Sequence, residues 1–513
     1  MKLNYKRTIL VGFAFFLISA FWQAYDATIA LTLTNKFGMS QTWSGVIMAL
    51  DNILALFLLP LFGTLSDKHK GKAGRRTPFI RFGTTVAAIA LIGLSFVDNM
   101  QLDLIREVSV VDDPAALEVI YDTQANRELQ TPGGTKFVLA ETFSREEFAQ
   151  IRSTDDIKDV TNHDETKTPY TSYVVPARQA YAAQQTLNNP TPLILFICVL
   201  LVLLVAMGTF RSPAVALMPD VTLKPLRSKA NAIINLMGNA GGIIVLLLGM
   251  GFAFGISSAK NAMMSYTPYY ITIAAVMIGA LIVFLATVKE PKWAAQMQSD
   301  SIRYGLETTD DDESKNSGSR KLAKDEKFSL ICILLSVALW YFGYNAVTSK
   351  YSVYAPNVLL MGYSETMLIA QACAIVAYLP AGMVASKIGR KKTILAGIVM
   401  LAAAFTVAAF MRAGSPVWLM YIMFALAGVA WATINVNSFP MVVEMCSGSD
   451  VGKYTGFYYT ASMAAQTATP MISGFLMDQL GMTALFPYAA IFVALAFITM
   501  SLTRHGDAKP LAK

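Results

Sequence analysis

The chain has 513 residues, of which 55% are hydrophobic and only 15% are charged, and its formal net charge is +7. This composition is too apolar for an ordinary soluble protein, so it excludes a soluble enzyme and predicts a chain that mostly faces lipid. The four cysteines and three histidines stand apart in the sequence without metal-ligand spacing, and we expect no metal and no cofactor.

Twelve apolar stretches follow one another along the chain, and each is close to the roughly 20 residues that a helix needs to cross a bilayer core. They predict an all-α membrane protein with twelve transmembrane helices in two six-helix pseudo-symmetric halves, and a small extracellular domain inserted between helices 3 and 4. The stretches lie near 8–33, 42–65, 78–97, 192–217, 230–256 and 268–288, then near 328–349, 364–385, 393–411, 416–438, 453–476 and 484–502.

These stretches divide the chain into six segments. Residues 1–98 hold transmembrane helices 1–3, residues 191–288 hold helices 4–6, and residues 328–503 hold helices 7–12. Residues 99–190 form the insert, residues 289–327 a polar cytoplasmic linker that we expect to be a solvated, disordered tether, and residues 504–513 a cytoplasmic tail.

The insert at 99–190 carries 15 acidic and eight basic residues, and thus has the opposite charge to the rest of the chain. Its stretches 115–129 and 144–151 have the pattern of amphipathic helices, and 136–140 the pattern of a strand. We therefore expect a small folded α+β domain.

The distribution of Lys and Arg predicts the orientation. With the N-terminus inside, 29 basic residues fall on cytoplasmic segments and only four on the short outer loops. Because cytoplasmic loops carry the excess of basic residues, both termini should be cytoplasmic, in a multi-pass protein of the plasma membrane. The same rule explains the net charge without a nucleic-acid partner.

An internal repeat relates the two halves. The run Gly63 to Thr77 after the second helix resembles the run Gly382 to Thr393 after the eighth, at an offset of 319 residues. Asp220 and Glu444 correspond at an offset of 224 residues, and the two offsets differ by 95 residues, close to the length of the insert. Duplication of a six-helix unit followed by one insertion explains both offsets.

The repeated loop motifs place glycines, carboxylates and basic residues together at the cytoplasmic ends of helices. Such groups can cap helices and form contacts that break and reform, which suits a gate; the alternative is that they only anchor the topology. The predicted gating residues are Gly63, Asp67, Arg75, Arg76, Asp220, Arg227, Gly382, Arg390 and Glu444.

With these motifs and the helix count, the chain resembles the major facilitator superfamily. The run Pro60 to Ile80, and the run Pro213 to Gly242 with Asp220 and Arg227, are similar to the glycoside/pentoside/hexuronide:cation symporters, in particular their sucrose-transporter-like branch. This resemblance implies cation-driven symport of a glycoside by alternating access.

The sequence departs from the melibiose branch of that family. Where that branch has cation-binding aspartates, this chain has Ala55, Leu59 and Arg211. The resemblance therefore implies coupling to protons rather than to sodium.

Three ionisable residues lie well inside predicted spans: Asp26, Asp51 and Arg211. Because charges inside a membrane are costly, they are expected to face a cavity or a partner, and we assign cation coupling to these three. The alternative is a static ion-pair cluster between helices.

A polar and aromatic face on each half suggests a sugar site. Trp22, Gln23 and Asp26 share one face of the first helix, since they are three and four residues apart. The seventh helix repeats the pattern, where Tyr351 can also be an interface anchor. An Asn ladder at 231, 235 and 239 favours helix packing over binding. The predicted substrate-binding residues are Trp22, Gln23, Asp26, Tyr341, Tyr344 and Asn345.

Together these features predict a secondary active transporter in the lipid bilayer, a proton-coupled symporter of a sugar or glycoside. Two other functions remain open: a facilitator or exporter of another small solute on the same fold, and a membrane sensor whose insert binds a ligand. An enzyme is not expected, because the sequence has no nucleophile elbow and no phosphate loop.

Overall fold

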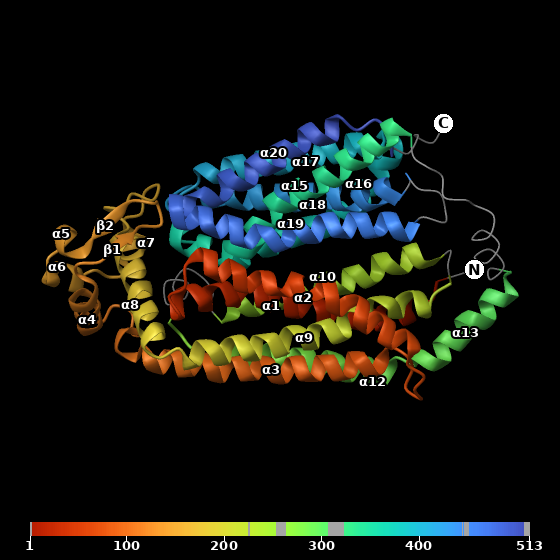
Figure 1. Cartoon of the computed structure of the whole chain (residues 1–513), viewed down its shortest axis with the longest axis horizontal. Coiled ribbons are helices and arrows are strands. Elements are labelled where there is room, and N and C mark those ends of the chain that lie inside the picture. Colours follow the sequence, from red (N-terminus) through yellow and green to blue (C-terminus); the bar gives the residue numbers. More distant parts are fainter. Residues whose placement is uncertain are drawn as a thin grey trace.

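The structure, a computed structural model, describes residues 3–223, 226–252, 263–305, 323–443, 445 and 451–506. Two helical halves lie side by side with their helices along the long axis, and residues 99–190 form a smaller body at one end (Figure 1). We call this end the insert end. The opposite end, where helix α13 lies, is the linker end.

Each half contributes six long helices. The first half has α1 (Tyr5–Leu31, continued by η1, Thr32–Lys36), α2 (Gln41–Lys68), α3 (Thr77–Leu104), α9 (Thr191–Asp220), α10 (Arg227–Gly251) and α12 (Thr267–Thr287). The second half has α15 (Lys324–Tyr354, continued by η5, Ala355–Leu359), α16 (Tyr363–Ile388), α17 (Arg390–Phe410), α18 (Val417–Val443), α19 (Val451–Leu480) and α20 (Leu485–Ser501).

Eleven helices in the described part of the chain are long and apolar enough to cross a membrane. The twelfth long helix is α19, with 30 residues, and it is not among these eleven, because polar residues interrupt its apolar stretch. Its hydroxyl side chains Ser462, Thr469 and Ser473 are buried inside the bundle. These polar side chains of α19 therefore face the protein interior rather than lipid.

Each half has its own apolar core. In the first half α1 packs against α10, and α3 against α9 and α12; in the second half α16 packs against α18, and α15 against α19 and α20. Buried hydrophobic residues form a separate cluster in each half, for example around Phe21 in the first and Trp340 in the second. The halves can thus behave as two rigid bodies that meet along α2 and α19, α10 and α16, and α1 and α15.

The start of α2 and the end of α19 lie in very close contact at the insert end. A Cβ on Gly45 would lie 2.0 Å from the main-chain oxygen of Pro470, and one on Gly474 would lie 2.2 Å from that of Gln41. Only glycine permits two helix backbones to approach this closely. We call this contact the insert-end gate.

The insert is a compact α+β unit. Helix α3 continues past the predicted boundary at residue 98 to Leu104, and the insert adds its own helices and one hairpin. In the hairpin, Leu129 lies opposite Phe137. Its elements are η2 (Arg106–Val108), α4 (Pro114–Gln124), β1 (Glu128–Gln130), β2 (Lys136–Val138), α5 (Leu139–Thr142), α6 (Arg145–Ala149), α7 (Asp155–Lys158), η3 (Tyr170–Val174) and α8 (Val175–Asn188).

A hydrophobic cluster of its own stabilises the insert. Ile120, Leu139, Phe148 and Tyr170 are fully buried in it. Asp156 is buried too, and its carboxylate accepts from the main-chain N–H of Tyr170 and of Thr171. Burial of these side chains explains how a segment rich in charge folds as a unit.

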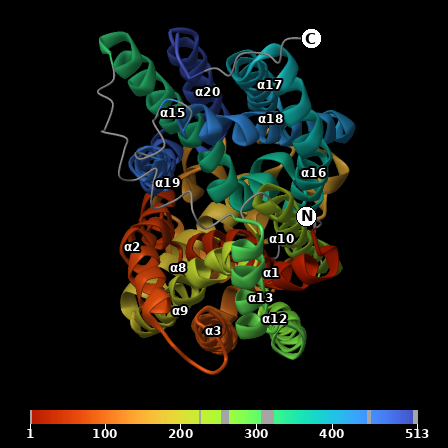
Figure 2. The ribbon, with the colours of Figure 1, turned by 90° about the vertical axis from the view of Figure 1, so that its right-hand side faces the viewer.

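The prediction that the whole 289–327 linker is a disordered tether is wrong for its first part. Residues Glu290–Arg303 form helix α13, which leads away from α12 at the linker end (Figure 2). Glu290 is 3% exposed, and the guanidinium of Arg7 lies 4.7 Å from the ring centre of Trp293. These contacts order a segment whose composition alone is that of a solvated chain. Residues 306–322 lie outside the described part.

Candidate functional site

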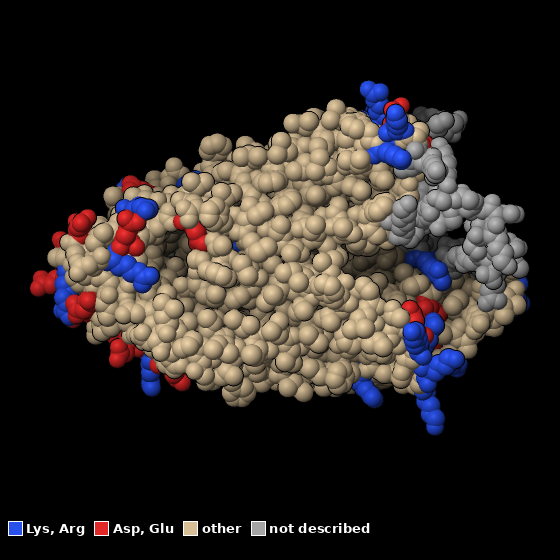
Figure 3. All heavy atoms as spheres, viewed as in Figure 1, with Lys and Arg blue, Asp and Glu red and all other residues tan. Residues whose placement is uncertain are grey.

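Charged side chains gather at the two ends of the molecule, and the surface between them is almost free of charge (Figure 3). The same view shows a hollow between the two halves toward the linker end. Deep in the bundle a cavity of about 180 Å³ lies between α10 of the first half and α15, α16, α17 and α18 of the second. Its lining residues include Asn239, Tyr344, Thr348, Gln371, Tyr378 and Trp431.

An aromatic platform forms one wall of this cavity. The rings of Tyr344 and Trp431 are stacked, with 3.6 Å between centroids and an interplanar angle of 4°. Tyr341 approaches Trp431 edge-on at 5.3 Å. Tyr341 and Tyr344 belong to the predicted substrate-binding set, whereas Trp431 does not. The sequence does contain a signal for Trp431, because it lies in the middle of a predicted span, far from the membrane interfaces where tryptophan is usual.

Two predicted positions on α15 have other partners. Asn345 donates through its side-chain nitrogen to the main-chain oxygen of Gln466 (3.1 Å), which ties α15 to α19. Tyr351 is fully buried and accepts from the hydroxyl of Thr366 (2.9 Å). It is therefore a core residue rather than an interface anchor.

Gln23 links the halves across the cavity. Its side-chain nitrogen donates to the hydroxyl of Tyr363 (2.9 Å), and its side-chain oxygen accepts from Gln371. On the same helix, Trp22 has an indole N–H without a partner among the described residues. Gln23 is thus directed to the second half, and Gln371 on α16 is an amide that sequence reasoning missed.

The three charges assigned to coupling lie within electrostatic range of one another. Asp51 interacts with Asp26 and with Arg211, and the Arg211 guanidinium lies 5.4 Å from the ring centre of Trp22. All three charged side chains are half-buried. No ion pair found among the described residues joins Arg211 to either carboxylate. The arrangement is an open cluster rather than a closed set of ion pairs.

At the linker end, Arg76 is the centre of a network within the first half. Arg76 is 4% exposed. Its guanidinium donates to the Asp220 carboxylate (2.8 Å) and to the Ser66 hydroxyl (2.5 Å), and it forms an ion pair with Asp67. Arg75 contacts Asp220 at 3.2 Å. The predicted motif residues 67, 75, 76 and 220 are therefore brought together.

Glu290 completes this network and was not predicted. Its carboxylate accepts from the main-chain N–H groups of Arg75 (2.6 Å), Arg76 (2.9 Å) and Thr77 (2.8 Å). These are unpaired donors at the start of α3, so the carboxylate caps that helix. The positive φ of Gly74 (+108°) lets the loop turn tightly around it.

The remaining predicted gating residues are spread over both halves. The Arg227 guanidinium donates to the main-chain oxygens of Thr222 (3.3 Å) and Pro219 (3.1 Å) beside the end of α9. Gly63 faces Ser212, and Gly382 faces Val436. Arg390 begins α17. Glu444, the predicted counterpart of Asp220, lies outside the described residues.

The insert-end gate carries charged contacts between the halves that the sequence did not indicate. The Asp478 carboxylate accepts from the main-chain N–H groups of Gln41 and Thr42, both at 2.8 Å. The Lys350 ammonium, fully buried, donates to the main-chain oxygen of Gln41 at 2.6 Å. A helix N-terminus in one half is thus capped from the other half, and the gate is closed.

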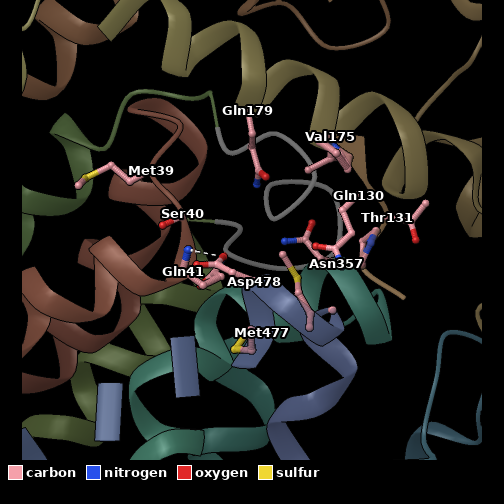
Figure 4. A pocket seen from close by; sticks show the side chains of 14 residues that line it. Met39, Ser40, Gln41, Gln130, Thr131, Val175, Gln179, Asn357, Met477 and Asp478 are labelled. Atoms are coloured by element: carbon pink, nitrogen blue, oxygen red, sulfur yellow. Dashed lines mark hydrogen bonds between the residues drawn. The ribbon is translucent and has the colours of Figure 1, made fainter. Parts of the chain in front are cut away.

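A second, smaller cavity of about 110 Å³ lies above this gate. Met39, Gln41, Asn357 and Asp478 surround it from the two halves, and Gln179 faces it from the insert (Figure 4). The contacts of Asp478 and Lys350 close the bundle at the insert end. The hollow between the halves lies toward the opposite, linker end.

Comparison with known proteins agrees with this architecture. A family model described as Major Facilitator Superfamily matches residues 180–377 and 366–513. The chain is similar to the MFS-type transporter ppzB of Metarhizium rileyi (strain RCEF 4871), at 28% identity over 141 residues. This match covers 27% of the chain and 29% of the relative, less than a third of that protein's length.

Solved structures share the fold over nearly the whole chain. The inward-open xylose transporter XylE from E. coli has a TM-score of 0.57 at 14% identity, covering 99% of this chain and 98% of that one. A bacterial homologue of the iron transporter ferroportin, in an inward-facing state, has a TM-score of 0.56 at 11% identity, covering 98% and 100%. At such identities the likeness describes the fold alone.

Proposed function

The chain belongs to the major facilitator superfamily, and from this premise we propose that it moves a sugar or glycoside across the plasma membrane by alternating access, driven by protons. As a member it is a multi-pass membrane transporter of small solutes and not an enzyme. We place it in the sucrose-transporter-like branch of the glycoside/pentoside/hexuronide:cation symporters, with twelve transmembrane helices.

The substrate class rests on one observation, the stack of Trp431 on Tyr344 in the wall of the central cavity. Flat aromatic surfaces bind the apolar faces of sugar rings, and the cavity also presents the amides of Asn239 and Gln371 for hydroxyl groups. This pairing of rings with uncharged hydrogen-bonding groups suits a neutral polyhydroxylated ring better than an ion.

Asp26, Asp51 and Arg211 are the residues to which we assign coupling. A carboxylate near the cavity binds or releases a proton as its surroundings change, and a nearby guanidinium favours the charged form. Since Asp51 interacts with Arg211 without an ion pair between them, a small movement between the access states can alter its proton affinity. The positive charge of Arg211 beside Asp51 disfavours a bound metal cation, whereas a proton can be held by either carboxylate.

The gates fit the same cycle. With the insert outside and both termini inside, the closed insert-end gate and the hollow at the linker end correspond to an inward-open transporter (Figure 3). The network of Arg76 with Asp67 and Asp220 then lies in the first half at the cytoplasmic mouth, where the second half can approach it as the halves rock.

The decisive experiment is uptake of radiolabelled mono- and disaccharides by proteoliposomes. A proton gradient at constant sodium should drive accumulation of at least one sugar, and a sodium gradient at constant pH should not. Transport of another solute class with no sugar accepted would contradict the substrate assignment, and sodium-driven uptake would contradict the coupling ion.

A further inference from the structure

The root of the insert is fixed to the first half. The Lys36 ammonium at the end of η1 and the Asp98 carboxylate on α3 are both fully buried and lie 2.5 Å apart. Gln101 donates to the main-chain oxygen of Lys36 (2.8 Å) and to the Thr186 hydroxyl on α8 (3.1 Å). Because this base is buried and these hydrogen bonds join η1, α3 and α8, the insert and the first half move as one body.

The far side of the insert contacts the second half at a first point, the loop after α19. The main-chain N–H of Met482 donates to the main-chain oxygen of Pro132 (2.9 Å). Gly134 and Gly481 lie directly against each other, and a Cβ on Gly481 would lie 2.6 Å from the nitrogen of Gly134. Both glycines have positive φ, +99° and +90°, so this contact requires glycine on each side.

The second point of contact is the loop between α17 and α18. The main-chain N–H of His163 donates to the main-chain oxygen of Ala413 (2.7 Å), and a Cβ on Gly414 would lie 2.7 Å from the nitrogen of Asn162. Asn162 and His163 have φ values of +53° and +50°. Two successive non-glycine residues in this region are strained, and such strain persists only where neighbours hold it.

We propose that the insert is a clamp on the insert-end gate: anchored on the first half and bound to two loops of the second, it holds α2 and α19 together and favours the state that is closed at this end. Opening of the gate must pull the second half away from the first, and therefore must break both contacts or strain them. The clamp thus sets the balance between the two access states.

The Pro132–Met482 and His163–Ala413 contacts consist of main-chain hydrogen bonds and glycine approaches, so a methyl group is the sharpest probe. Gly481→Ala would place its Cβ in the Gly134 backbone, and Gly414→Ala would do the same at Asn162. The matched control is Gly305→Ala, because Gly305 also has positive φ (+65°) but a Cβ there meets nothing within 4 Å. The control carries the cost of backbone strain without any effect on the clamp.

The readout is the rate at which a maleimide labels Ser44→Cys in the purified full chain, in a background with the native cysteines replaced. Ser44 is fully buried beside Gly45 in the gate, so it reacts when the gate opens. Loss of one docking contact should speed labelling about fivefold in Gly481→Ala and in Gly414→Ala, with Gly305→Ala unchanged. Equal rates in all four proteins would overturn the clamp.

A crosslink tests the same idea in the opposite direction and does not depend on the glycine variants folding. Pro132→Cys with Met482→Cys joins backbones that already share a hydrogen bond. Oxidation of this pair should slow labelling of Ser44→Cys at least fivefold, and reduction should restore it. Unchanged labelling in the crosslinked protein would show that the gate opens without release of the insert.

Discussion

Trp431 on α18 lies face to face with Tyr344 on α15, with ring centroids 3.6 Å apart. The two residues are 87 positions apart in the sequence and meet only because α15 and α18 both border the central cavity. We expect Trp431→Ala to raise the KM for the proposed sugar substrate about tenfold, because half of the stacking surface is lost. Uptake kinetics check this. Trp418→Ala is the control, since Trp418 lies on the same helix and is 62% exposed.

The proposed coupling role of Asp26 and Asp51 predicts that two transport activities can be separated. Asp26→Asn and Asp51→Asn remove a proton-binding group but keep the size of the side chain, so the one that carries the proton should lose uphill accumulation and keep sugar-for-sugar exchange. Proteoliposome assays of both activities distinguish the cases. If the replaced aspartate only binds sugar, its variant should lose both uphill accumulation and exchange. Asp103→Asn, at an exposed position at the end of α3, should change neither.

The hydrogen bonds of Glu290 predict that its replacement lowers the stability of the protein, although it lies far from the cavity. Both of its carboxylate oxygens accept hydrogen bonds from the start of α3, and Glu290→Gln offers an acceptor on one side only. We expect the free energy of unfolding to fall by about 1–2 kcal/mol. Thermal unfolding in detergent measures this. Glu146→Gln, in the exposed first turn of α6, should leave the melting temperature unchanged.

His163 predicts that docking of the insert depends on pH. Burial, together with the charge of Arg412 on the facing loop, lowers the pKa of His163 from 6.5 to about 4. The docked state therefore binds fewer protons than the released state. The free energy of docking is therefore most favourable above about pH 6.5. It becomes less favourable as the pH falls from there to about 4, by on the order of 3 kcal/mol in total.

The distance between spin labels at Glu146→Cys on the insert and Val417→Cys at the start of α18 reports this release. We expect the distance distribution to broaden and lengthen between pH 6.5 and 4. His163→Gln cannot take up a proton and should keep the short distance throughout this range. The same broadening in His163→Gln would assign the effect to another group.

The orientation is tested by proteolysis. With the insert outside, as proposed, a protease site beside Glu146, which lies on the exposed surface of the insert, should be cut in intact cells. A site placed between residues 310 and 319 should be protected until the cells are permeabilised. The reverse cleavage pattern would show that the transporter has the opposite orientation, with the insert-end gate on the cytoplasmic side.

The sequence predicted the helices and the depth of the charges, because both follow from local apolar length. Residues 67, 75, 76 and 220 were found because a repeated motif marks them. Trp431, Asp478 and Glu290 were missed because their roles depend on contacts with residues far away in the sequence; Asp478 binds the backbone at Gln41, 437 positions earlier. Helix α13 was missed because its order comes from docking and not from its composition.

The buried pair of Lys36 and Asp98 has a practical consequence for any molecule that approaches from the aqueous side. Since this pair, together with the hydrogen bonds of Gln101 to Lys36 and to Thr186 of α8, fixes the base of the insert to the first half, a binder that holds the insert also holds one half of the transporter without entering the bilayer. An antibody fragment that binds both the insert and the loop at Ala413 should stop transport, whereas one bound only to the exposed face near Glu146 should leave transport unchanged.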